Sequence, residues 1–257
     1  SNTAEFTTYT SKVDSKVEIK ADSEGTAGAG NRYITVYKKD KALNTSMSNV
    51  EFVLQHWTGT QFEDVTDPAI TDSNGRLTFG NKTDDNENIS KNIVALKNNQ
   101  VLQPGEIYAL KETTPKGYKS KDPIVFIFEN KDSKKSDDYY SKFDDAIIIG
   151  NTGEQLVENE SIVSVKAVKE WETSGTTHPN SVNVTLSAKV DGEDYSLAGV
   201  ANTTATLNSE NSWTAQWDNL PEYNGSKKIT YSVTETVPQG YRATYESATD
   251  QKTKVTT

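Results

Sequence analysis

The amino-acid sequence predicts an all-β chain made of two tandem Ig-like β-sandwich domains. Short segments of alternating polar and apolar residues recur along it, separated by polar turn signals and without long helical periodicity. A length of 257 residues is ample for two domains of ordinary size. One motif also occurs twice, as YALKETTPKGY from Tyr108 and as YSVTETVPQGY from Tyr231. Two copies of one module are the simplest interpretation.

Residues 1–30 are rich in Thr, Ser and Lys, and we expect them to form a leader or an extra strand. The first domain is expected to cover residues 31–152, with polar insertions at residues 81–100 and 131–145. Its expected strands are YITVYKK, VEFVLQHW, RLTFG, PGEIYALKE, PIVFIFE and AIIIGN.

The segment TGEQLVENES, residues 152–161, is polar and acidic, which is typical of a linker. The second domain is then expected to cover residues 153–257 once this linker is included. Its expected strands are IVSVKAVKEW, VNVTLSAKVDG, ATLNSENSWTAQW and KKITYSVTE.

Composition excludes several classes of function. A formal net charge of −10 argues against nucleic acid and anionic membranes as partners, and no run of about 18 apolar residues could span a bilayer. The absence of cysteine excludes disulfides, thiolate catalysis and Cys-ligated zinc. His56 and His178 fall in separate domains, which argues against a hydrolytic triad or a histidine metal site, so we expect no cofactor. Because the sequence shows neither an initiating Met nor a signal peptide, we expect a processed chain or an excised fragment.

Several predicted strands carry an apolar face that ends in a polar residue. Residues i, i+2 and i+4 of a strand share a face. In the first domain these faces are Ile34, Val36 and Lys38; Tyr108, Leu110 and Glu112; and Ile147, Ile149 and Asn151. In the second domain one such face ends at Lys169 and Trp171, and another at Glu235. A single polar residue of this kind is most simply a strand end that reaches water, but three complementary groups in one domain weaken that explanation.

Together these segments resemble the B-type domains of the Gram-positive collagen adhesin (Cna B-type, prealbumin-like) and the related pilin domains. The resemblance covers roughly residues 31–257 and depends on the two copies of the Glu-Thr…Pro…Gly-Tyr motif together with KKDKALNTSMSNVEFVL and KEWETSGTTHPNSVNVTL.

The resemblance implies a self-formed isopeptide bond, in which a lysine on the first strand of a domain is joined to an asparagine on the last. Carried over, it implies a bond between Lys38 and Asn151 with Glu112 as the catalytic residue. In the second domain Lys169 and the catalytic Glu235 match. Counting along the last strand places Thr257 where the asparagine is expected, so either the second bond is absent or its asparagine lies beyond this sequence. Such a reaction occurs once per molecule, and the chain is therefore not expected to be an enzyme with turnover.

The function implied is that of a structural module in an extracellular, cell-wall-anchored surface protein or an ancillary or basal pilin. Its partners would be other pilus subunits or the cell wall, joined through sortase. Two alternatives remain open. The insertions at residues 81–100 or 131–145 could bind host extracellular matrix as part of an adhesin, because long loops often carry function. The chain could also be an accessory β-sandwich of a secreted glycosidase.

Overall fold

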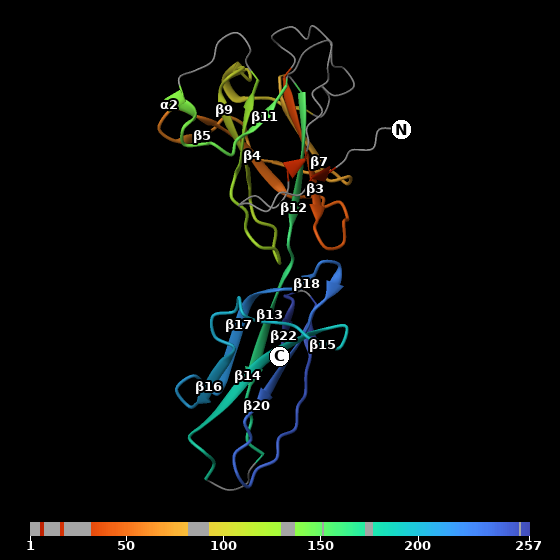
Figure 1. Cartoon of the computed structure of the whole chain (residues 1–257), viewed down its shortest axis with the longest axis vertical. Helices are drawn as coiled ribbons and strands as arrows, with labels where there is room; N and C mark the ends of the chain where they lie inside the picture. Colours follow the sequence, from red (N-terminus) through yellow and green to blue (C-terminus); the bar gives the residue numbers. More distant parts are fainter. Residues whose placement is uncertain are drawn as a thin grey trace. The chain divides into compact units, whose positions relative to one another are not determined.

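The computed structural model describes residues 6–7, 16–17, 32–81, 93–129, 137–150, 152–172, 177–251 and 253–257. The all-β prediction is confirmed: among these residues the strands are short and the helical elements are the brief turns η2 (Lys97–Asn99) and α2 (Asp137–Tyr140). The chain divides into two compact units (Figure 1). The first runs mainly to Asn159, and the second begins at Glu160 and also takes in two short segments, Lys41–Leu43 and Lys116–Lys119.

Unit 1 contains two sheets besides the short pair β1 (Phe6–Thr7) and β2 (Lys16–Val17). The four-stranded sheet has the order β12 (Thr152–Asn159), β3 (Tyr33–Asp40), β7 (Arg76–Gly80), β8 (Ile93–Val94). The other sheet has the order β11 (Ile147–Ile149), β10 (Ile124–Phe128), β9 (Ile107–Glu112), β4 (Glu51–Trp57), β5 (Phe62–Asp64), with β6 (Ala69–Ile70) also paired to β4.

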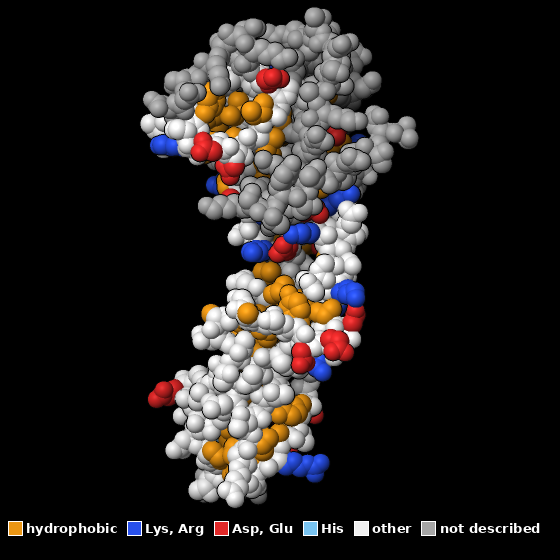
Figure 2. Space-filling view, in the orientation of Figure 1, with side chains coloured by type: hydrophobic (Ala, Val, Ile, Leu, Met, Phe, Trp, Pro, Cys, Tyr) orange, Lys and Arg blue, Asp and Glu red, His pale blue; other side chains and the backbone are white. Residues whose placement is uncertain are grey.

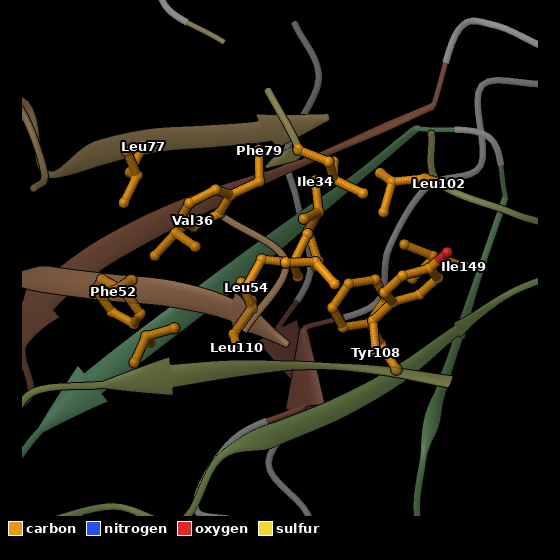
Figure 3. Packing of buried hydrophobic residues seen from close by; sticks show 14 of the residues in the cluster. Ile34, Val36, Phe52, Leu54, Leu77, Phe79, Leu102, Tyr108, Leu110 and Ile149 are labelled. Carbon is orange, nitrogen blue, oxygen red and sulfur yellow. The ribbon is translucent and has the colours of Figure 1, made fainter. Parts of the chain in front are cut away.

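The core of unit 1 follows from the alternation of side chains along the strands. In β3 every second residue is buried, beginning with Ile34 and Val36. Figure 3 shows these two residues packing with Leu54 and Leu110, which belong to the other sheet. Because the same alternation continues along β3, the side chain of Lys38 also points into the core.

The segment predicted as a linker is a strand instead. β12 pairs in parallel with β3 over its whole length, from Thr152 opposite Tyr33 to Asn159 opposite Asp40. Its polar composition conceals this, because two of its inward positions are the polar residues Gln155 and Asn159. The boundary between the units consequently lies after Asn159, further along the chain than the expected boundary at residues 152–153.

Unit 2 contains two four-stranded sheets and one short hairpin. The first has the order β17 (Thr214–Pro221), β13 (Ile162–Val168), β22 (Val255–Thr256), β21 (Thr249–Asp250). The second has the order β15 (Glu193–Asp194), β14 (Ser181–Val190), β16 (Thr204–Asn208), with β20 (Thr230–Glu235) also paired to β14. The hairpin joins β18 (Tyr223–Asn224) to β19 (Lys227–Lys228). Strand β14 alternates between exposed and buried residues, as expected for a strand with one face in the core.

The surface agrees with the polar composition of the chain. Figure 2 shows acidic and basic side chains scattered over the described part of one face, among many uncharged polar groups. No helix in the described part of the chain is long and apolar enough to cross a membrane.

Candidate crosslinking site

Lys38 is the most unusual residue of the core, because a lysine side chain is almost never fully buried unless it is paired. It is 0% exposed and is among the largest fully buried side chains of the described chain. Its Nζ atom lies 3.3 Å from the backbone oxygen of Lys39 and 3.6 Å from the Sδ atom of Met47. Both of these acceptors are uncharged. A full positive charge at this position therefore requires a buried counter-ion.

Glu112 provides the acidic group of the site. It is the last residue of β9 and lies opposite Phe52 of β4, so the sheet register directs it to the same interior as Lys38. Its side chain is 4% exposed, and Oε2 lies 3.7 Å from the Nζ atom of Lys38. The predicted pairing of Lys38 with Glu112 therefore agrees with the geometry.

Asn159 is the third residue of the site. It ends β12, is 1% exposed, and donates a hydrogen bond of 2.5 Å from Nδ2 to Oε1 of Glu112. The register explains how it reaches this position. Val157 lies opposite Lys38, and Asn159 is two residues further along, so it projects from the same face of β12.

The predicted partner of Lys38 is Asn151, whereas the described amide beside Glu112 belongs to Asn159. Asn151 lies outside the described residues, and the strand that follows it begins with Thr152 opposite Tyr33, five residues before Lys38. Among the described residues, Asn159 provides the amide at this site. The alternation of Gly153, Gln155, Val157 and Asn159 was the signal in the sequence that could have identified it.

Burial changes the protonation of Lys38. Burial lowers the pKa of the amine, the neighbouring Glu112 raises it and the Lys121 cation lowers it, and together these effects bring the pKa to about 8. At pH 7.4 a pKa of 8 leaves about one-fifth of the amine neutral, against about one in a thousand for an ordinary lysine. The site therefore provides an amine that is nucleophilic near neutral pH.

Two acceptor atoms at the site could each accept a further hydrogen bond. Oε2 of Glu112 and Oδ1 of Asn159 are buried and accept no hydrogen bond from the described residues. Burying such atoms without a donor costs free energy. A proton on Glu112 would have both the amine and the amide within reach.

Unit 2 contains a corresponding Lys–Glu pair. The Nζ atom of Lys169 lies 3.2 Å from Oε2 of Glu235, and the two side chains are 15% and 9% exposed. The same Nζ atom lies 4.4 Å from the centre of the Trp171 ring, in a cation–π contact. Lys169 is thus less buried than Lys38 and has different neighbours.

The strand register of unit 2 bears on the position expected for its asparagine. Strand β22 pairs with β13 through Ser164 opposite Val255 and Val165 opposite Thr256. Val165 comes four residues before Lys169, so a strand continuing in this register would come opposite Lys169 only beyond Thr257. The position equivalent to Asn159 is therefore not Thr257, whose backbone N–H instead donates to the carbonyl of Ala248.

The two histidines lie in separate units and make separate contacts. His56 is 2.9 Å from Oε2 of Glu106, which also accepts a hydrogen bond from the hydroxyl of Tyr139. His178 stacks on Trp171, with ring centroids 4.6 Å apart. In the described part of the chain no group of three or more His, Cys, Asp or Glu residues is arranged to hold a metal ion.

Comparison with known proteins finds one family model and several similar proteins. Residues 165–257 match the family model of the Cna protein B-type domain. Over 157 residues the chain is 27% identical to the collagen adhesin of Staphylococcus aureus. The matched region covers 60% of this chain but only 12% of the adhesin. Two solved structures are also similar. The single B repeat unit (B1) of the collagen-binding surface protein of Staphylococcus aureus has a TM-score of 0.26 and 17% identity, covering 87% of this chain and 94% of that chain. BcpA, the major pilin subunit of Bacillus cereus, has a TM-score of 0.34 and 15% identity. The match covers 82% of this chain and 61% of BcpA.

Residues 165–257, which match the model of the Cna protein B-type domain, all lie within unit 2. The predicted relationship to Gram-positive collagen adhesins and pilins is thereby confirmed.

Proposed function

We propose that unit 1 forms an intramolecular isopeptide bond between Lys38 and Asn159, with Glu112 as its proton carrier. The observation that supports this proposal is the buried arrangement of the three side chains, with Glu112 3.7 Å from the amine and 2.5 Å from the amide nitrogen. The three residues lie at or near the ends of three different strands, so the fold itself provides the proximity that the reaction needs.

The reaction exchanges one amide for another. The neutral Nζ atom of Lys38 attacks Cγ of Asn159, and the proton released from the nitrogen passes to Glu112. Glu112 then returns a proton to Nδ2, the Cγ–Nδ2 bond breaks, and ammonia leaves. One C–N bond forms and one breaks, with no change in oxidation state. Glu112 ends as it began, and the product is a neutral amide in place of a buried charge.

The bond would alter how the unit bears force. β3 and β12 lie side by side in parallel, and Lys38 and Asn159 lie near the ends at which both strands finish. Tension entering through β3 would cross directly to Asn159 and bypass the chain between them. By the loop-entropy argument used for disulfides, closing a loop of about 120 residues contributes about 5 kcal/mol. That is comparable with the whole net stability of a small domain.

We infer from this arrangement that the chain is a structural module of an extracellular, cell-wall-anchored surface protein or pilin. The likeness to a collagen adhesin and the Cna B-type domain of residues 165–257 support this assignment. Its partners would be neighbouring pilus subunits or the cell wall, joined through sortase. The bond would make the module resistant to shear and proteolysis. It would form once in each molecule, without catalytic turnover.

Intact-mass spectrometry tests the bond directly. The wild-type chain should weigh about 17 Da less than its calculated mass, because one ammonia is lost. Asn159→Ala should restore the full mass, and so should Lys38→Ala and Glu112→Ala. The matched control is Asn151→Ala, which should keep the deficit. A deficit that disappears in Asn151→Ala and persists in Asn159→Ala would contradict the proposed partner, and a full mass for the wild type would refute the bond itself.

A further inference from the structure

Met47 is the single methionine of the chain, and its thioether contacts the amine of Lys38. Its Sδ atom lies 3.6 Å from Nζ, at nearly the same separation as the carboxylate of Glu112. Met47 lies in the connection between β3 and β4 and packs at the margin of the unit 1 core. The proposed reaction assigns it no role.

The backbone of Met47 is fixed to the site on both sides. Its N–H donates to the carbonyl of Lys38 at 2.9 Å, and its own carbonyl accepts a hydrogen bond of 2.7 Å from the hydroxyl of Thr71. Thr71 is buried and also accepts from the N–H of Val50. The thioether is therefore anchored to the residue that it contacts and does not depend on a freely moving loop.

The neighbours of Nζ suit a neutral amine. A neutral amine has two N–H bonds and one lone pair, whereas an ammonium group has three N–H bonds and no lone pair. Two uncharged acceptors face this nitrogen, the carbonyl of Lys39 and the thioether of Met47. If both N–H bonds point to these acceptors, the lone pair is directed to the remaining side, where Glu112 contacts Nζ and holds Asn159.

We propose that Met47 is a positioning residue for the isopeptide reaction, and this inference rests on the proposed function of the site. Its thioether accepts one N–H of the neutral amine and covers Nζ against water. A thioether is a weak acceptor and carries no charge, so it orients the amine without stabilising the ammonium form as a water molecule or a hydroxyl would. A hydrocarbon side chain of the same size would exclude water but could not orient the amine.

Norleucine in place of Met47 separates these two roles, because it replaces only the sulfur atom by a methylene group. The chain is made by cell-free synthesis with methionine, norleucine or selenomethionine, and formation of the bond is followed by intact mass after a chase. Norleucine should slow the first-order rate about twofold, the factor expected for a hydrogen bond at the weak end of the usual range. Selenomethionine, which retains an acceptor atom, should restore the wild-type rate. Equal rates with methionine and norleucine would overturn the proposal.

Met47→Ser tests the exclusion of water. A hydroxyl and the space around it should stabilise the ammonium form and move the pH midpoint of the rate upward, whereas norleucine should leave the midpoint in place. The other charged groups that influence Lys38 are Glu112, Lys121 and Asp40, and all of them are kept in this variant. Ser48→Ala, at an exposed position of the same connection, should change neither the rate nor the midpoint. An unchanged midpoint in Met47→Ser would contradict the shielding role, and a wild-type chain that keeps its full mass would instead refute the bond on which this proposal rests.

Discussion

Without its crosslink, unit 1 should become more stable as the pH rises. In Asn159→Ala the bond cannot form, so Lys38 remains a buried amine. Its pKa in the folded chain is lowered to about 8, chiefly by burial, whereas in the unfolded chain it keeps the ordinary value of 10.5. Between these two values the unfolded chain binds more protons than the folded one. Raising the pH therefore favours the folded state, and the penalty of burying the amine is largest below pH 8.

The size of the effect follows from the difference in pKa. Well below pH 8, a shift from 10.5 to about 8 costs about 3 kcal/mol of stability. At pH 9.5 most of the folded molecules hold a neutral amine, and the remaining cost is about 1.4 kcal/mol. The free energy of unfolding of Asn159→Ala should thus be about 2 kcal/mol larger at pH 9.5 than at pH 7. For a unit of this size that corresponds to a rise in Tm of about 6–10 °C.

Differential scanning calorimetry of the whole chain can measure this rise. The transition of unit 1 is the one that moves to lower temperature when Asn159→Ala removes the bond. Lys38→Met in the same background is the matched control, because it keeps the length of the side chain and removes the amine, and its transition should move much less between the two pH values. If both variants respond equally to pH, burial of the Lys38 amine does not control the stability of the uncrosslinked unit.

Two further predictions concern the neighbourhood of Lys38 and the second unit. Gly75 has φ +73°, and a Cβ atom there would lie 2.4 Å from the carbonyl oxygen of Lys38. Gly75→Ala should therefore slow formation of the bond and lower the Tm of unit 1. An unchanged rate, followed by intact mass, would show that the strand tolerates the added Cβ atom. The wild-type chain should lose one ammonia and not two, because the register of unit 2 places no described residue at the position equivalent to Asn159. A crosslinked peptide that contains Lys169 in a tryptic map would contradict this prediction.

The sequence determined those features that depend on local alternation. A period of two along a strand was enough to predict that Lys38 and Glu112 lie on inward faces and that Lys169 and Glu235 repeat the arrangement. The duplicated Glu-Thr…Pro…Gly-Tyr motif likewise predicted a second module of the same kind. These predictions are reliable because they need only the direction of a side chain relative to its own strand.

The tertiary structure decided which asparagine meets the pair. Parallel pairing joins residues far apart in sequence, and nothing local in TGEQLVEN shows that Val157 lies opposite Lys38. The polar residues Gln155 and Asn159 made a buried strand look like a linker, because their burial is offset by hydrogen bonds that only the folded chain provides. Met47 was missed for the same reason, since its contact with Lys38 depends on how the connection between β3 and β4 folds back onto the strand.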